Sequence, residues 1–428
     1  MKRVLIISPH FPPSNLAAVH RSRLFAQHLP EFGWEPVVLT IHEKFYEEEP
    51  DWNLAKLLPP ELKVEKTGAF PLTRPRTIGD IGLRGLLQLY RRALQLIRKE
   101  KIDFLYIPIP SFYVALLGRW LHGKTGVPYG IDYIDPWVHR FPGSDRRFSR
   151  HWFSTRLAEW LEPIAVKRSS VITGVAEGYY KEVLVRNPHL QQTCLTDAMP
   201  YGGEERDHRM VKTLAIQPYL FKKDPSKTLL VYAGAMLPKA YAPLEAIMQA
   251  MVANPAVFEK VQIHFIGTGK TPSDPEGYNI RPMAEKYDLW QKNIFEYPAR
   301  IPYLDVLSHL EAASGVFILG STEAHYTPSK VYQAVLSDKP IMAVLHTRST
   351  ATEVIRATRA GVVLDFDGEA GVTGIADRFA GVFGEYQLFA KSFSADKVDK
   401  ARFGEYSARA VTGRLAALLD RAILLPSK

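Results

Sequence analysis

The residues with the clearest capacity for chemistry lie in segment 326–333, Tyr-Thr-Pro-Ser-Lys-Val-Tyr-Gln. Threonine is a good helix N-cap and proline suits the first helical position, so we expect a helix to begin at Pro328 after the cap Thr327. The first amides of a helix have no partner inside it, and with the helix dipole they attract anions. Ser329 adds a hydroxyl group and Lys330 a positive charge. This set of groups matches the needs of a nucleotide diphosphate.

Other residues could contact the same ligand, namely a glutamine, two glycines and a lysine. Gln333 lies one turn along the same predicted helix, within reach of a ribose beside that diphosphate. Gly234 directly follows an apolar run, where a glycine lets a phosphate approach the backbone, and Lys239 adds a charge. Gly267 is a second glycine of this kind. The alternatives are a well-capped helix and ordinary strand-to-helix turns, all without a ligand.

A second group of polar residues follows apolar runs in the first half of the chain. The loop Pro13, Ser14 and Asn15 follows the first run, and His20 lies in the helix expected after it. Such a loop is expected to face a substrate, or else to be a rigid proline-rich connector. The segment 132–139 adds carboxylates and an aromatic ring, which suit sugar hydroxyl groups and C–H faces; its candidate residues are Asp135, Trp137 and His139. The alternative is that Asp135 caps a turn and Trp137 lies in the core.

Several other kinds of site are excluded by their missing motifs. The stretch 267–271, Gly-Thr-Gly-Lys-Thr, is similar to the end of a phosphate-binding P-loop. His264 occupies the position where that motif needs a glycine, so the stretch is not a P-loop. The first apolar run lacks the Gly-x-Gly-x-x-Gly turn of a dinucleotide-binding dehydrogenase. No His-x-x-x-His pair supports a zinc site, and no Gly-x-Ser-x-Gly elbow supports a hydrolase. We therefore expect no metal.

Short apolar runs alternate with helical patterns along the whole chain, which predicts parallel sheets with both faces covered. Expected strands are 3–8, 36–40, 62–67, 104–109, 129–133 and 171–175, then 229–233, 262–266, 294–297, 315–319, 341–345 and 362–364. A connector with Gly202-Gly203 separates the two series, and residues 406–424 form a final amphipathic helix. The predicted fold is α/β with two Rossmann-like domains. Ligands would bind beyond the carboxyl ends of the strands, in a cleft between them.

Composition narrows the class of protein. The 428 residues carry a net charge of +9 and a single cysteine, Cys194, so no disulfide can form within the chain. The first residues do not resemble a signal peptide, and no apolar run is long enough to span a membrane. These features favour a cytoplasmic protein. Basic residues gather in helical stretches at 91–101 and 140–150, which indicates either solvated faces or a peripheral contact with the inner face of a membrane.

Taken together and in order, these segments resemble the family-4 retaining glycosyltransferases of the GT-B fold. Residues 4–13 are similar to that family's opening strand and proline loop, and 132–137 to its acidic-Pro-Trp segment. Residues 199–203 resemble the entry to its second domain, and 327–340 its donor motif. The resemblance implies an acceptor-binding domain at 1–201, a nucleotide-sugar-binding domain at 202–404 and a helix at 405–428 that packs back on the first.

The resemblance also implies an activity. A hexose-type sugar would pass from a nucleotide-diphosphate sugar to a glycan, lipid-linked or small-molecule acceptor, with retention of anomeric configuration and without a cofactor or nucleic acid. His20, Asp135 and His139 would act around the transferred sugar. The donor would be bound by a larger set, namely Gly234, Lys239, Gly267, Arg300, His325, Thr327, Ser329, Lys330 and Gln333.

The chain departs from the family pattern at three donor positions. His325 and Gln333 stand where the family has two glutamates, and Ala235 replaces an arginine that binds phosphate. Gln333 can still hydrogen-bond a ribose hydroxyl group, but without a full charge. These changes leave open two other functions on the same fold: a non-catalytic binder of nucleotide sugars, and an epimerase or hydrolase of nucleotide sugars. A third alternative, a nucleic-acid binder, is suggested only by the net positive charge of the chain.

Overall fold

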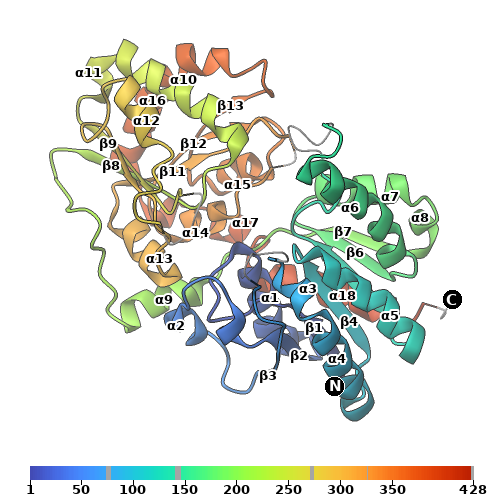
Figure 1. Ribbon diagram of the computed structural model, residues 1–428. Coiled ribbons are helices and arrows are strands. Elements are labelled where there is room, and N and C mark those ends of the chain that lie inside the picture. Colours follow the sequence, from blue (N-terminus) through green and yellow to red (C-terminus); the bar gives the residue numbers. More distant parts are fainter. Residues whose placement is uncertain (74–78, 140–145, 270–273, 325, 426–428) are drawn as a thin grey trace. The chain divides into compact units, whose positions relative to one another are not determined.

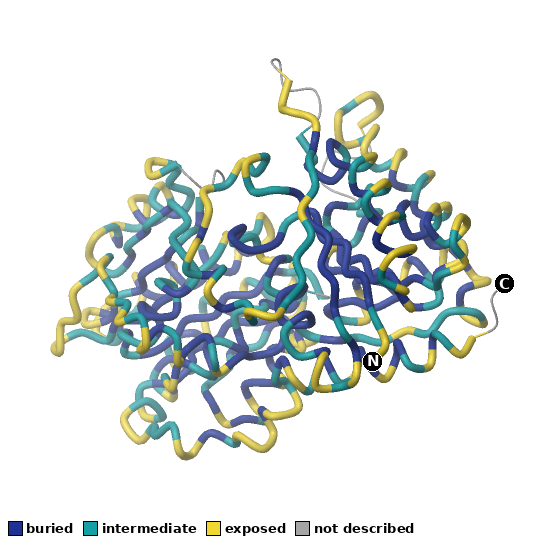
Figure 2. Tube along the Cα trace, turned by 90° about the horizontal axis from the view of Figure 1, so that it is seen from below, coloured by how far each residue is buried: buried dark blue, intermediate teal, exposed yellow. Residues whose placement is uncertain are grey.

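A computed structural model describes residues 1–73, 79–139, 146–269, 274–324 and 326–425 (Figure 1). Its contacts divide the chain into two compact units. The first unit is Met1–Tyr201 together with Ala408–Lys428, and the second is Gly202–Ser407. Within each unit the inner strands are buried, and many of the exposed residues lie on loops and outer helix faces (Figure 2).

The described part of the first unit holds a parallel sheet of seven strands in the order β3-β2-β1-β4-β5-β6-β7. The strands are β1 Lys2–Ile7, β2 Trp34–Ile41, β3 Lys63–Thr67, β4 Phe104–Ile109, β5 Tyr129–Tyr133, β6 Val171–Gly174 and β7 Leu195–Ala198. The helices are α1 Ala17–His28, α2 Trp52–Ala55, α3 Ile81–Arg84, α4 Leu86–Glu100, α5 Ala115–Thr125, α6 Arg150–Val166, α7 Lys181–Arg186, α8 Leu190–Thr193 and α18 Ala408–Ala422. The central strands β1, from Val4 onward, and β4 are buried because helices cover both faces.

The second unit repeats this plan with six parallel strands in its described residues, ordered β10-β9-β8-β11-β12-β13. They are β8 Thr228–Ala233, β9 Val261–Ile266, β10 Ile294–Tyr297, β11 Gly315–Leu319, β12 Ile341–His346 and β13 Gly361–Phe366. Its helices are α9 Glu205–Thr213, α10 Tyr241–Ala253, α11 Pro255–Phe258, α12 Arg281–Lys286, α13 Tyr303–Ala312, α14 Lys330–Leu336, α15 Thr350–Thr358, α16 Thr373–Ser392 and α17 Lys400–Gly404. Both sheets are those of a Rossmann-like α/β fold, as the alternating pattern predicted.

Helix α18 belongs to the first unit although it lies at the end of the chain. Val411, Leu415 and Leu419 are fully buried and share a core cluster with β1 and α1. The contacts place the boundary after Ser407, rather than after residue 404 as the sequence suggested. Burial of this apolar stripe is what fixes α18 there.

A buried ion pair ties α1 to the sheet of the first unit. The guanidinium group of Arg21 donates to both carboxylate oxygens of Asp132 at the end of β5. It also donates to the carbonyl oxygens of Met199 at 2.7 Å and Pro200 at 2.8 Å, while Thr173 donates to Asp132 at 2.7 Å. Both charged side chains are fully buried, so Asp132 is a structural residue and is not open to a ligand.

Each sheet has one point where the strand order reverses. In the first unit it lies between β1 and β4, and in the second between β8 and β11. Open α/β sheets bind ligands outside the carboxyl ends of the strands at such a point. The loops after these four strands are therefore where a site is expected in each unit.

Candidate functional site

In the second unit, the loops after β8 and β11 meet around one glycine and one lysine. Gly234, directly after β8, has a φ of +122°, which side chains other than glycine rarely adopt. A Cβ atom built there would lie 3.2 Å from the Nζ atom of Lys330, which begins α14. Because Gly234 has no side chain, the space between its backbone and the ammonium group of Lys330 is not filled by a Cβ atom.

Lys330 is in an unusual environment for a lysine. Its Nζ atom is buried and has no hydrogen-bond partner among the described residues. It lies 3.5 Å from the ring centroid of Tyr232, a close cation–π contact. Burial lowers the pKa of Lys330 to about 7. A buried amine without a hydrogen-bond partner is costly, so Lys330, near the strand-order reversal, is the strongest candidate in this unit for contact with an anion.

The predicted start of the donor helix is wrong by two residues. Helix α14 begins at Lys330 and not at Pro328, and the N-cap residue Ser329 makes no side-chain capping bond. The hydroxyl group of Thr327 pairs instead with that of Thr350 at 2.8 Å, because α15 begins beside it. The amide of Val331 donates to the carbonyl oxygen of Pro328 at 3.1 Å, so it is not turned outward. Helix α14 has only seven residues, so the side chain of Lys330, and not a helix dipole, is the candidate group for binding an anion.

Gln333 is held by a neighbouring histidine. Its Oε1 atom lies 3.0 Å from Nε2 of His208 on α9, and Nδ1 of the same ring lies 2.8 Å from Glu311 on α13. His208 is almost fully buried. The carboxylate accepts a hydrogen bond, so Nδ1 carries a proton. The contact at Nε2 holds the amide group of Gln333 against the ring, whichever end of that amide faces it. Sequence reasoning missed this arrangement, since its three residues come from three separate helices.

The other donor-side candidates lie along the same edge of the sheet. Lys239 approaches Glu323 at 3.7 Å, and its carbonyl oxygen accepts from the amide of Thr322. Gly267 has a φ of +72° at the end of β9, and a Cβ atom there would lie 3.9 Å from the Cα atom of Arg300. Both loops therefore follow neighbouring strands. The predicted His325 lies outside the described residues.

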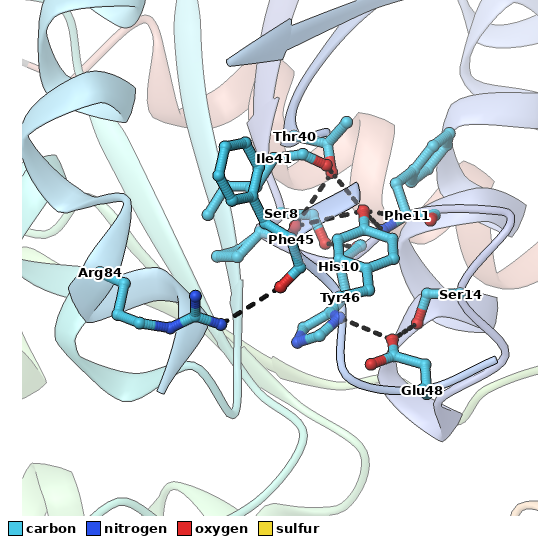
Figure 3. A network of polar contacts seen from close by, with 11 residues as sticks. Ser8, His10, Phe11, Ser14, Thr40, Ile41, Phe45, Tyr46, Glu48 and Arg84 are labelled. Atoms are coloured by element: carbon cyan, nitrogen blue, oxygen red, sulfur yellow. Dashed lines mark hydrogen bonds and ion pairs between the residues drawn. The ribbon is translucent and has the colours of Figure 1, made fainter. Parts of the chain in front are cut away.

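In the first unit, the loop after β1 carries a polar network (Figure 3). The Nδ1 atom of His10 lies 2.9 Å from Oε1 of Glu48, and the hydroxyl group of the predicted Ser14 donates to the same oxygen. Burial would raise the pKa of Glu48, but the hydrogen bond and charge of His10 and the hydroxyl of Ser14 lower it to about 2. Pro13 follows a cis peptide bond.

The remaining candidate residues of the first unit differ in how far their side chains are exposed to solvent. Asn15 lies just before α1, and His20 lies in its first turns and is half-buried. Asp135 is exposed after β5, near enough to His139 for their charges to interact. Trp137 is only 7% exposed, and its ring stacks on that of Phe112 with centroids 5.9 Å apart. The alternative interpretation of Trp137 as a core residue therefore describes it better than that of a sugar platform.

Sequence reasoning overlooked His10 and Glu48. His10 stands three positions after β1, at the place where the strand order reverses, and this position was the available signal. Nothing local marks Glu48, which lies 38 positions further on. Among the described residues, no group of three or more histidine, cysteine, aspartate or glutamate side chains is placed to hold a metal ion, and no helix is long and apolar enough to cross a membrane.

Comparison with known proteins identifies the fold. No family model matches the chain, and no curated protein matches it by sequence. Among solved structures, sucrose-phosphate synthase from Thermosynechococcus elongatus is similar with a TM-score of 0.67 and 13% identity, over 98% of this chain and 99% of the other. Anabaena HepE in complex with UDP-glucose has a TM-score of 0.64 and 13% identity, over 98% and 100%.

A third similar structure is a UDP-forming α,α-trehalose-phosphate synthase from Burkholderia xenovorans, with a TM-score of 0.61 and 13% identity over 99% of each chain. At these identities the likeness concerns the fold. The fold is that of the GT-B proteins, with two Rossmann-like units.

Proposed function

We propose that this chain is a glycosyltransferase. It would move a hexose-type sugar from a nucleotide-diphosphate sugar to a glycan, lipid-linked or small-molecule acceptor. Retention of anomeric configuration is part of the proposal and rests on the family-4 resemblance. The single observation that carries the proposal is the buried ammonium group of Lys330 beside Gly234, where the strand order of the second unit reverses.

The chemistry of this position fits a diphosphate better than other ligands. A diphosphate brings two negative charges, which would compensate the buried Nζ atom, and Gly234 admits its oxygens close to the backbone. Two of the similar structures were solved with UDP or UDP-glucose bound, which supports a nucleotide-sugar donor. Gln333, held by His208, would then hydrogen-bond the ribose.

In the transfer step, Lys330 would act on the leaving group. As the bond from the anomeric carbon to the diphosphate breaks, negative charge grows on the phosphate oxygens. A cation already in place at low dielectric stabilises that charge without reorganisation, and stabilisation of this kind often contributes most to an enzyme's rate enhancement. On this proposal Lys330 supplies charge that a metal ion supplies elsewhere, and turnover should persist in EDTA.

A peripheral contact with a membrane is the second part of the proposal. Helix α6 exposes an apolar stripe at helical spacing, made of Phe153, Leu157, Trp160 and Ile164. The exposed residues Arg146, Arg147, Arg150 and Arg156 lie on and just before this helix. Aromatic and aliphatic side chains beside arginine match an anionic lipid surface. Such a contact would bring a lipid-linked acceptor, and with it a cytoplasmic location at the inner face.

The test is product analysis with UDP-glucose labelled in the sugar, with and without a panel of acceptors and EDTA. Label in a new glycoside supports transfer, and its anomeric configuration decides retention. Free label with released UDP identifies a hydrolase, and a changed sugar still attached to UDP identifies an epimerase. Binding of UDP-glucose without any turnover would favour the non-catalytic binder, which Gln333 and His325 in place of glutamates make the second candidate.

A further inference from the structure

The second unit contains a long connection from α9 to β8, whose residues 217–226, here called the strap, form neither helix nor strand (Figure 1). Most of the strap is exposed, including Tyr219. Among the described residues, amides of the strap donate to another element only at Tyr219 and Leu220. Both donate to the same atom, Nε2 of His309 on α13, at 3.1 Å. One ring nitrogen thus holds the backbone of the strap against the unit.

The hydrogen bonds of His309 fix its tautomer. Its Nδ1 atom lies 2.6 Å from the carbonyl oxygen of Asp305, one turn earlier in α13. A carbonyl oxygen can only accept, so Nδ1 carries the proton, and backbone amides can only donate, so Nε2 offers them its lone pair. The neutral ring therefore satisfies every one of these partners. A second proton, placed on Nε2, would face two N–H groups and remove both hydrogen bonds to the strap.

The ring of His309 lies among other rings and is fully buried. Tyr219 and Phe221 of the strap pack against it, with ring centroids 5.1 and 5.4 Å away. Phe221 also contacts His264 on β9 at 4.9 Å, and Nε2 of His264 is buried without a hydrogen-bond partner in the described part of the chain. Burial lowers the pKa of His309 below its usual 6.5, while burial and the charge of His309 lower the pKa of His264 to about 4. Both rings are therefore neutral at neutral pH.

The other titratable groups beside these rings are Asp305 on α13, Tyr219 on the strap and Tyr297 on β10. The charge and the carbonyl group of Asp305 raise the pKa of His309, but burial outweighs them. Tyr297 places its hydroxyl group 3.2 Å from Nδ1 of His264. Burial raises the pKa of both tyrosines to about 12, so neither changes its charge on acidification. His309 is the ring that accepts from the strap, so acid acts on the strap through it.

We infer that the strap is an acid-released segment, held while His309 is neutral and freed when its Nε2 atom takes up a proton. The inference goes beyond the proposed function and does not depend on it. Because the strap is largely exposed, water can accept hydrogen bonds from the freed amides. The sign follows from linkage: the open ring binds a proton that the closed ring excludes, so the attachment is complete above about pH 7 and weakens as the pH falls.

The opening is expected to stay local, because α9 has other attachments. His208 on α9 lies 2.8 Å from Glu311 on α13, and a proton on His208 would strengthen this contact. The carboxylate of Asp207, also on α9, accepts from the hydroxyl group of Tyr303 at 2.9 Å. Neither contact involves the strap. Release would therefore uncover the face of α13 around His309 without detaching α9.

The experiment is hydrogen–deuterium exchange of the full chain, resolved to single amides by mass spectrometry and corrected for the intrinsic pH dependence of exchange. Protection of the Tyr219 and Leu220 amides should fall at least about tenfold between about pH 7.5 and pH 4.5, because two hydrogen bonds are lost. Protection of the buried strand β11 should stay constant and serves as the internal reference.

Two variants separate the attachment from its response to acid. His309→Gln keeps an acceptor oxygen but cannot titrate in this range, so the strap should stay protected throughout. His309→Leu removes the acceptor, so protection should already be at least about tenfold lower at neutral pH. The matched control is His346→Gln, since His346 is also buried and its Nδ1 atom also accepts from a backbone amide, that of Arg348 at 3.1 Å. This control should keep the wild-type response.

Equal protection of the strap at both pH values in the wild-type chain would overturn the inference. A loss that β11 shares would overturn it too, because the whole unit would then be unfolding. The same acid response in His309→Gln would show that another group controls the strap.

Discussion

The protonation of Lys330 should make donor binding depend on pH. Its Nζ atom is buried without a hydrogen-bond partner, and its pKa is lowered from 10.5 to about 7. At pH 8 the free protein would therefore carry this proton on only about one tenth of the molecules. A bound diphosphate compensates the charge and raises the pKa again. Binding should take up about 0.9 proton per nucleotide at pH 8.

The sign of the effect on affinity follows directly. The ligand binds the protonated form of Lys330, so its affinity is greatest about one unit below the pKa of the free protein and falls as the pH rises through that pKa. Above about pH 8 the Kd for UDP-glucose should rise by nearly tenfold per pH unit, or about 1.4 kcal/mol. Isothermal titration in two buffers of different ionisation enthalpy measures both the Kd and the proton uptake.

The variant Lys330→Met separates binding from folding. It should lose proton uptake and the pH dependence, and its affinity at pH 6.5 should fall by at least about tenfold. It should not lose stability: because the folded-state pKa is lowered, the ammonium group destabilises the fold below pH 7, by up to about 5 kcal/mol relative to high pH. Lys227→Met is the control, at a partly exposed lysine of the same unit whose Nζ atom donates to the carbonyl oxygen of Glu259. A Kd independent of pH, with no proton uptake in the wild type, would refute the assignment.

Three further outcomes test other parts of the structure. Gly234→Val should weaken UDP-glucose binding at least about tenfold in titration calorimetry, since its side chain would meet Lys330 and strain a positive φ; equal affinity would contradict the close approach. Asp132→Asn should lower the free energy of unfolding by about 3–5 kcal/mol in urea, since Arg21 loses its buried counter-ion; a loss under 1 kcal/mol would show the ion pair to be weak. Phe153→Ser with Trp160→Ser should reduce cosedimentation with vesicles containing phosphatidylserine about tenfold, and unchanged sedimentation would remove the membrane proposal. The exposed Val185→Ser in α7 is its control.

Local patterns predicted most of the fold. Every expected strand is present within a few residues, because short apolar runs between helical patterns are typical of strands in a sheet covered on both faces. One further strand, β7 Leu195–Ala198, was missed, since it is only partly buried and carries Asp197 and Thr196. Residue type and position after a strand were also enough to single out Gly234 and Lys330.

The environment of those residues could not be predicted in the same way. The start of α14 was misplaced because the hydroxyl group of Thr327 pairs with that of Thr350 and does not cap α14. Thr350 lies on another helix, so the residues around Thr327 do not reveal this partner. The sequence left open whether Trp137 contacts a sugar or lies in the core, because its burial depends on Phe112 from the loop after a different strand. Neither partner can be inferred from the surrounding residues.

By itself, then, the sequence determined the order of elements, the parallel sheets and the positions that carry charge. The tertiary structure alone decided which of those charges are paired. Arg21 meets Asp132 across 111 positions and His10 meets Glu48 across 38, whereas the Nζ atom of Lys330 is buried without a hydrogen-bond partner in the described chain. The reason is physical: strand formation depends on neighbours in sequence, but pairing and burial of a charge depend on which strands lie side by side.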